Sequence, residues 1–313
     1  MDELDERTPR EAGEPAGPSQ HLLVQRAAEL NSAGRHDLAE DYARRALARV
    51  PEDARAHVQL ALARHGRGAT KEGEELLGQA LALAPDSALA YGVRALLRTE
   101  LGRYRDAEAD VLEALRLEPE DGFLFRVYGQ LVFKAGQLGK AEKLLRRALE
   151  LDPEDQHSSA LLALVLSEAK KEAAALQHGR RSLALAPDED FGHLALGVAL
   201  LRSGRPFAAR EHLREALRLD PDADSEAAFL EADQCCRVVY LPMFYWSLVV
   251  GRLPGQNLGA WALFMVFLFG GPKLGLPPLV VNLGALAYIL MCVYSWFAGA
   301  LVRRWVKWFP PKL

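Results

Sequence analysis

Small and apolar residues recur in this chain with a period of 34 residues between positions 20 and 221. One leucine occupies the same place in every period: Leu47, Leu81, Leu115, Leu149, Leu183 and Leu217. A small residue precedes each leucine and a proline follows it four positions later, with Ser182 as the one departure from alanine. A fixed period of this size predicts a stacked array of helical hairpins, with two helices in each period.

Each period also carries residues that end and separate two helices. Seventeen residues before each proline lies a glycine, except for Lys170 in the fifth period: Gly34, Gly68, Gly102, Gly136 and Gly204. Glycine adopts the left-handed backbone that ends a helix, and proline cannot continue one. Acidic residues follow the prolines in "PED", "PDS" and "PDE" and are suited to cap the next helix. We therefore expect a glycine turn within each hairpin and an altered turn at Lys170.

The pattern resembles the tetratricopeptide repeat family over residues 20–221. This resemblance implies an all-α fold in which six helical hairpins form a right-handed superhelical solenoid. The first unit departs from the family with Arg26 in place of leucine, and the next two place Arg64 and Arg98 where the family prefers tyrosine. Before the repeats we expect a disordered acidic leader at residues 1–19, and after them a capping helix or linker at residues 222–236.

The C-terminal part differs from the repeats in charge and hydrophobicity. The chain has a formal net charge of −4, yet after Asp233 it contains no acidic residue. Leu279–Val302 is a stretch of 24 residues without a charge, followed by "RRWVKW". As a helix it would be about 36 Å long, enough to cross a hydrocarbon core of about 30 Å. We therefore predict a membrane region at residues 237–313 that ends in a basic tail at 303–313.

Two shorter apolar stretches precede this one. Residues 254–270 just reach the length of a span and are predicted to form a transmembrane hairpin with 277–302, with a re-entrant or interfacial helix as the alternative. Residues 237–252 are aromatic-rich and contain Pro242, which favours an interfacial helix; packing against the last repeat is the alternative. Basic residues flank the hairpin, against Lys273 alone in its turn, so we expect the repeats and the C-terminus to be cytoplasmic.

The sequence carries no pattern typical of an enzyme. It contains no phosphate-binding loop, nucleophile elbow or metalloprotease motif, so we expect no enzymatic activity, catalytic residue, cofactor or metal. One near-match to a calcium loop has carboxylates at four ligand positions: Asp220, Asp222, Asp224 and Glu231. Because Ser225 replaces the glycine that the sharp turn of this loop requires, helix capping explains the carboxylates more simply.

Two further features bear on modification and on nucleic acids. Cys235 and Cys236 precede the predicted membrane region, where palmitoylation is a known modification. A protein that already spans a membrane gains little from it, so we expect unmodified thiols. Basic and acidic residues alternate along the repeat helices, which is typical of a solvated surface and not of a nucleic-acid site.

The first helix of each hairpin is expected to line the concave side of the array. The family resemblance places ligand contacts at the second, fifth, ninth, twelfth and thirteenth residues of a unit. In the fourth unit these are Phe123, Arg126, Gln130, Phe133 and Lys134. Two cations and an amide on one helix face suit an acidic or C-terminal peptide segment. The alternative is that these side chains only solvate the groove.

The sequence as a whole therefore predicts a membrane-anchored scaffold or adaptor. It would bind a protein or peptide partner in its concave groove at the cytoplasmic face of a membrane, with lipid as its other contact. The alternative is a structural or assembly subunit of a membrane complex that contacts partners mainly through its C-terminal helices. Neither the partner nor the oligomeric state follows from the residues.

Overall fold

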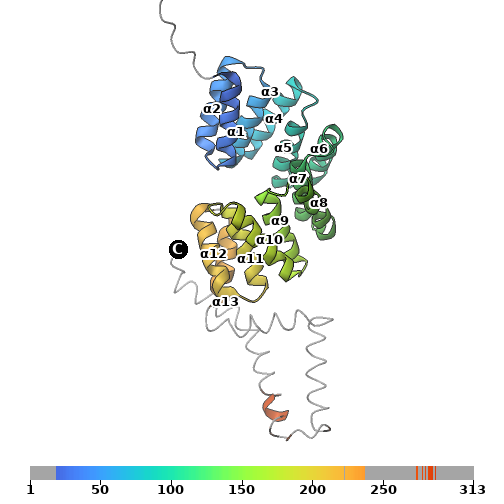
Figure 1. The fold of residues 1–313 in the computed structure, drawn as a ribbon, viewed down its shortest axis with the longest axis vertical. Helices are drawn as coiled ribbons and strands as arrows, with labels where there is room; N and C mark the ends of the chain where they lie inside the picture. Colours follow the sequence, from blue (N-terminus) through green and yellow to red (C-terminus); the bar gives the residue numbers. More distant parts are fainter. Residues whose placement is uncertain are drawn as a thin grey trace, which may run out of the picture. The chain divides into compact units, whose positions relative to one another are not determined.

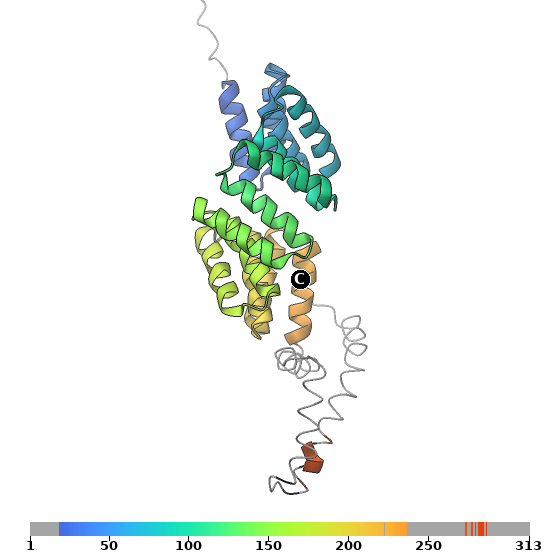
Figure 2. The same ribbon diagram turned by 90° about the vertical axis from the view of Figure 1, so that its right-hand side faces the viewer.

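The computed structural model describes residues 19–221 and 223–236, together with residues 273, 277, 279, 281–284 and 286. Up to residue 236 the described chain is a succession of helices of 13 or 14 residues joined by short turns, and it divides into two compact units (Figure 1). Each unit is built from antiparallel helical hairpins (Figure 2). The predicted all-α repeat solenoid is therefore confirmed.

Unit 1, residues 1–151, contains four hairpins. Their helices are α1 (Gln20–Ser32) and α2 (His36–Arg49), α3 (Ala54–Gly66) and α4 (Thr70–Leu83), α5 (Ala88–Glu100) and α6 (Tyr104–Leu117), and α7 (Gly122–Lys134) and α8 (Leu138–Leu151). Unit 2, residues 152–313, contains two described hairpins and one further helix. These helices are α9 (Gln156–Glu168) and α10 (Glu172–Leu185), α11 (Asp190–Arg202) and α12 (Pro206–Leu219), and α13 (Ala223–Cys236).

Side chains after the periodic prolines cap the first helix of the next hairpin. The Asp53 carboxylate accepts hydrogen bonds from the backbone N–H groups of Arg55 and Ala56 at 3.0 and 3.2 Å. Asp121 and Asp155 cap α7 and α9 in the same way, and Ser87 does so in the "PDS" turn. These bonds satisfy N–H groups that have no partner within the helix. The predicted capping role is thus confirmed, although Glu189 makes no such bond at α11.

The turn within each hairpin has a left-handed residue at its centre. The five predicted glycines have positive φ values between 69° and 83°. Lys170, which replaces glycine in the fifth hairpin, has φ 58°. The expected altered turn is therefore wrong as far as φ is concerned, because Lys170 adopts the same left-handed conformation as the glycines. This conformation brings the Cβ of Lys170 close to the backbone and is therefore strained.

Small residues let the helices approach within and between hairpins. The small residues that precede the periodic leucines, five alanines and Ser182, have 2% or less of their surface exposed. At two corresponding positions glycine makes space for a buried leucine of the following helix. A Cβ at Gly129 would lie 2.8 Å from Leu145, and one at Gly197 would lie 2.5 Å from Leu213. In these two hairpins, therefore, a buried leucine of the second helix packs directly against the backbone of the first helix.

The predicted membrane region lies largely outside the described residues. This applies to the interfacial helix at 237–252, the first span at 254–270, most of the second span at 277–302 and the basic tail at 303–313. Of the predicted leader only Ser19 is described, and its side chain caps α1. Among the residues that the structure describes, no helix has the combination of length and apolar composition needed to cross a membrane.

Candidate functional site

The predicted groove residues lie on α7, the first helix of the fourth hairpin. The Arg126 guanidinium lies 5.1 Å from the centroid of the Phe123 ring, within the range of a cation–π contact. Phe123 itself packs against the hydrophobic core formed with the preceding hairpin. Gly92 of α5 makes this possible, because a Cβ there would lie 3.0 Å from the ring. Phe123 therefore positions Arg126 and also holds α7 against α5.

Gln130 and Lys134 converge on a carboxylate that the sequence interpretation missed. The Gln130 amide donates to Glu100, the last residue of α5, at 2.9 Å. The Lys134 ammonium lies 3.9 Å from the other oxygen of the same carboxylate. Lys134 and Glu100 keep 40% and 33% of their side-chain surface exposed, so solvent reaches both. The structure thus places four of the five predicted groove residues in two small clusters, Phe123 with Arg126 and Gln130 with Lys134. The fifth, Phe133, is half-buried near the end of α7.

Glu100 also connects this cluster with α3. Burial lowers the pKa of His65, while the negative charge of Glu100 acts in the opposite direction. The sequence did hold a signal for Glu100, because it precedes Lys134 by one full repeat and therefore occupies the same position of its own unit. A carboxylate is thus present beside Lys134, one of the two cations that were predicted to bind one.

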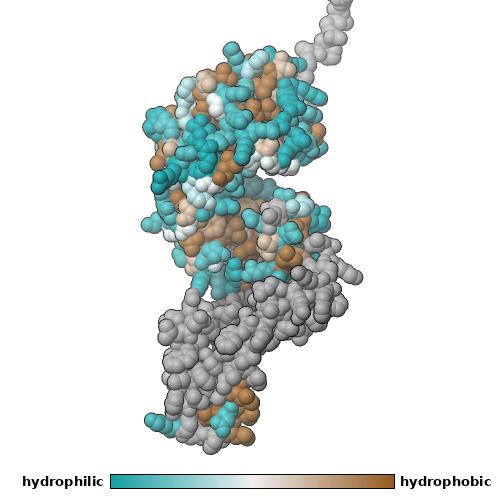
Figure 3. All heavy atoms as spheres, turned by 180° about the vertical axis from the view of Figure 1, so that it is seen from behind, coloured by the Kyte–Doolittle hydropathy of each residue, from teal (hydrophilic) through white to brown (hydrophobic). Residues whose placement is uncertain are grey.

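The ninth position of the first helices shows how α7 differs from its neighbours. It is occupied by a half-buried aliphatic residue in four other hairpins: Leu62, Leu96, Leu164 and Val198. In α7 the same position carries Gln130. The described surface is polar with apolar residues gathered in patches on the face seen in Figure 3. At this position α7 is therefore polar where the first helices of four other hairpins are apolar.

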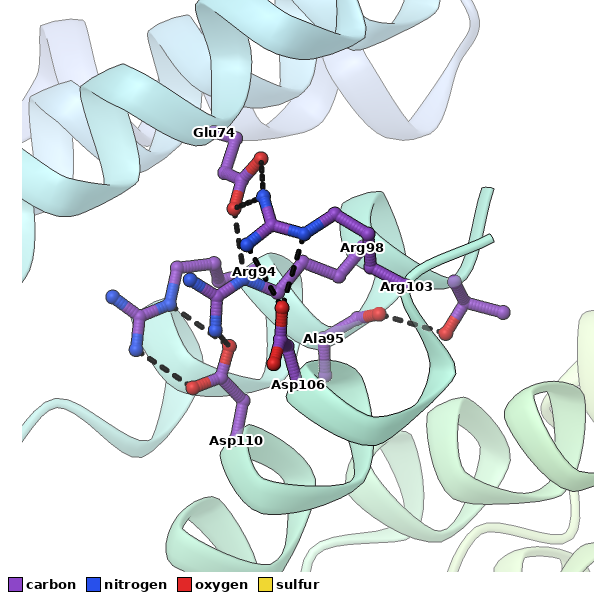
Figure 4. Close-up of polar contacts among 8 residues, drawn as sticks. Glu74, Arg94, Ala95, Arg98, Arg103, Asp106 and Asp110 are labelled. Atoms are coloured by element: carbon purple, nitrogen blue, oxygen red, sulfur yellow. Dashed lines mark hydrogen bonds and ion pairs between the residues drawn. The ribbon is translucent and has the colours of Figure 1, made fainter. Parts of the chain in front are cut away.

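A second polar arrangement links consecutive hairpins of unit 1. Glu40, Glu74 and Glu108 occupy the same repeat position, and each binds groups of the next hairpin. Glu40 pairs with Arg64 and Arg67. Glu74 binds Arg98 and Arg103, each at 2.8 Å (Figure 4), and Glu108 accepts from Tyr128 at 2.7 Å and from Lys140 at 3.2 Å. These residues hold neighbouring hairpins together. We refer to them as the carboxylate ladder.

The carboxylate ladder explains two departures from the family pattern. Arg64 and Arg98 stand where the family prefers tyrosine, and both use their length to reach a carboxylate of the preceding hairpin. Arg98 also donates to Asp110, a buried residue of α6. Arg94 donates two further hydrogen bonds to the same carboxylate, at 2.9 and 2.6 Å. Arg26, the third departure, forms an exposed pair with Glu29. Two of the three arginines are therefore ligands of buried carboxylates.

The described residues offer little reactive chemistry. Among them, no group of three or more histidine, cysteine or carboxylate side chains is arranged to hold a metal ion. Of the calcium-loop carboxylates, Glu231 lies on α13 and pairs with Arg202 at 3.0 Å. Cys235 belongs to the core of unit 2 with 2% of its surface exposed, and burial raises the pKa of its thiol to about 12. Its thiol is therefore a packing group and not a nucleophile.

Solved structures with a similar fold include two that superpose on about two thirds of this chain. One is described as the APC/C hetero-tetramer Cut9-Hcn1, with a TM-score of 0.57, 18% identity, and coverage of 68% of this chain and 42% of that chain. The other is PilW, described as a type IV pilus biogenesis factor, with a TM-score of 0.50, 21% identity, and coverage of 66% and 97%. At these identities the likeness concerns the fold alone.

Comparison with curated proteins found no match. Family models give a clear result. One model described as "Tetratricopeptide repeat" matches residues 26–88, 93–156 and 127–190, and a second with the same description matches residues 191–223. The first of these models alone covers more than half of the chain. Together with the helical hairpins, the glycine turns and the buried small residues, these matches show that the chain belongs to the tetratricopeptide repeat family.

Proposed function

We propose that this protein is a membrane-anchored scaffold that binds an acidic or C-terminal peptide segment of a partner on the concave side of unit 1, at α7. One observation carries the peptide assignment. Gln130 and Lys134 already hold the carboxylate of Glu100, so their geometry suits a carboxylate ligand. Arg126 adds a second cation on the same helix face, and its guanidinium is oriented by the Phe123 ring. The carboxylate of a partner would compete with Glu100 for these groups.

The membrane part of the proposal rests on the sequence. Two apolar stretches, residues 254–270 and Leu279–Val302, and the basic residues that flank them support a cytoplasmic scaffold with two spans. In this arrangement the repeats present a partner at the membrane surface. Tetratricopeptide repeats form extended concave surfaces suited to protein–protein interaction, and the tail restricts that interaction to one location.

The α7 assignment predicts opposite effects for two sets of substitutions. Arg126→Glu combined with Lys134→Glu should abolish binding of acidic peptides, because the reversed charges repel a carboxylate while the helix-packing residues stay in place. Glu100→Gln should strengthen binding, because it removes the internal competitor. Peptides with free C-termini are selected from a random library on the full-length protein, and their affinities for each variant are then measured by fluorescence anisotropy.

A matched control reverses two arginines outside the proposed site. Arg116 on α6 and Arg147 on α8 are exposed and pair with glutamates on their own helices. Their double replacement by glutamate changes the net charge by the same amount and should leave peptide affinity unchanged. Equal affinity of the selected peptides for wild type and for the Arg126→Glu, Lys134→Glu variant would refute the α7 site.

The alternative function, a subunit that contacts its complex through the C-terminal helices, is favoured by the apolar length of residues 237–313. Purification of the full chain and of a version without these residues separates the two proposals. We expect partners to remain with the shortened chain, which should also leave the membrane fraction. Partners that are lost together with the tail would support the subunit.

A further inference from the structure

Two histidines face each other in the last described hairpin. His193 on α11 and His212 on α12 have their Nδ1 atoms 3.2 Å apart. The two rings are tilted by 38°, with centroids separated by 5.4 Å. His193 makes a second contact through its other nitrogen, Nε2, which lies 3.2 Å from the backbone oxygen of Pro187. Both ring nitrogens of His193 are therefore in hydrogen-bonding contact.

These contacts determine the protonation pattern of the pair. A carbonyl oxygen only accepts hydrogen bonds, so Nε2 of His193 must carry a hydrogen. In the neutral ring, Nδ1 of His193 is then an acceptor, and Nδ1 of His212 must be the donor between the two rings. Two protonated imidazoles would place two N–H groups and two positive charges against each other at this distance. The observed arrangement therefore excludes the doubly protonated pair.

The charged neighbours do not offset this repulsion fully. On α12, Glu211 and Glu215 interact electrostatically with His212 and His193, respectively, but Glu215 is held by Arg218 at 2.6 Å. Charged residues on the helices that pack against this hairpin contact partners of their own. Glu168 and Glu231 both bind Arg202, and Asp233 binds Arg210. Glu189 binds Gln156 and His157, and Arg181 donates to the Pro153 carbonyl oxygen. Glu211 is thus a carboxylate whose charge acts on His212 in the direction opposite to burial.

We propose that the His193–His212 pair is a pH-sensitive latch that holds α12 against α11 at neutral pH and weakens this contact under mildly acidic conditions. The position of the pair supports a structural effect. Leu213, which follows His212, is fully buried against Gly197 of α11. α13 packs on the same hairpin, with Phe229 in the shared core. Loosening of α12 would therefore also loosen α13, the helix of unit 2 that directly precedes residues 237–313.

The direction of the pH effect follows from the environment of His212. Burial lowers the pKa of His212, and the neighbouring His193 lowers it further. The unfolded chain therefore binds protons more readily than the folded chain near the ordinary histidine pKa of about 6.5. Stability is fully present above this value and is lost as the pH falls through it toward the lower folded pKa.

Hydrogen exchange of the full-length protein in detergent tests the latch. After correction for the intrinsic pH dependence of exchange, amides of α11 and α12 should exchange severalfold faster at pH 5.5 than at pH 7.5. Amides of α7 and α8 in unit 1, two helices that contain no histidine, serve as an internal reference. His212→Gln should remove most of this difference, because glutamine can still donate to His193 but does not titrate. His21→Gln, an exposed position on α1, is the matched control and should retain it.

Two results would overturn the proposal. One is equal protection of α11 and α12 at both pH values in the wild type. The other is an undiminished pH difference in both His212→Gln and His193→Gln. If a variant is poorly folded, NMR of the wild type with labelled histidines gives an independent answer. At pH 7.5 it should show the hydrogen on Nε2 of His193 and on Nδ1 of His212, and the opposite assignment would exclude the latch.

Discussion

Replacing Asp110 with alanine is expected to lower the free energy of unfolding of unit 1 by about 3 kcal/mol, because it leaves the half-buried Arg94 without its carboxylate and leaves Arg98 with Glu74 alone. The Asp110 side chain is 6% exposed, and those of Arg94 and Arg98 are 19% and 18% exposed. Figure 4 shows the aspartate between the arginines of α5 and the backbone of α6. Urea denaturation followed by circular dichroism measures the change, and hydrogen exchange assigns it to α5 and α6.

Asp106 provides a control on the same helix. It also binds an arginine, Arg103, at 2.8 Å, but the two side chains are 51% and 47% exposed. Exposed pairs of this kind contribute at most about 1 kcal/mol, so Asp106→Ala should have a small effect. Combining Asp110→Ala with Arg94→Ala should restore part of the lost stability, because the pair is removed together. Similar costs for Asp106→Ala and Asp110→Ala would contradict the role assigned to burial.

Leu213→Ala should be the most damaging single truncation in α12, with a cost of about 2–5 kcal/mol. Leu213 is fully buried in the core of unit 2 and lies against the backbone of Gly197. Because glycine has no side chain that could move into the space, the cavity would remain largely unfilled. We expect earlier loss of helical signal in urea and faster hydrogen exchange in α11 to α13.

Phe207 on the same helix gives the matched comparison. Its side chain is larger than that of Leu213, yet it is 54% exposed. Truncation of exposed residues usually changes stability by about 0.5 kcal/mol or less, so Phe207→Ala should unfold close to wild type. A larger cost for Phe207→Ala than for Leu213→Ala would show that α12 packs through a different face.

Much of the fold could be predicted from the sequence because its determinants are local and repeated. Glycine turns, proline stops and capping residues each act within a few positions of the chain, and the 34-residue period repeats them six times. Repetition also identified the buried alanines, since one helix face recurs in every unit. Lys170 shows the limit of this reasoning. The packing of α9 and α10 imposes a left-handed turn there even on a residue that disfavours it.

The candidate site was predicted only in part. The residues of α7 followed from their repeat positions, and their role in binding a partner stays a prediction. Glu100 was missed, although it lies one repeat before Lys134, because charge alone does not reveal which side chains meet. The same holds for the carboxylate ladder. Its glutamates recur every 34 residues, and Arg64 and Arg98 share one repeat position. The other partners lie at different repeat positions: Arg67, Arg103, Tyr128 and Lys140.

By itself, the sequence determined the repeat family, the 34-residue period of the hairpins and the contrast between charged repeats and an apolar, basic tail. Tertiary structure alone decided that Gln130 and Lys134 share a carboxylate with α5, that Arg94 and Arg98 enclose Asp110, and that two histidines meet between α11 and α12. The physical reason is the range of the interactions. Turns and caps depend on backbone preferences over a few residues, whereas ion pairs and ring contacts depend on how closely two helices pack and which rotamers remain between them.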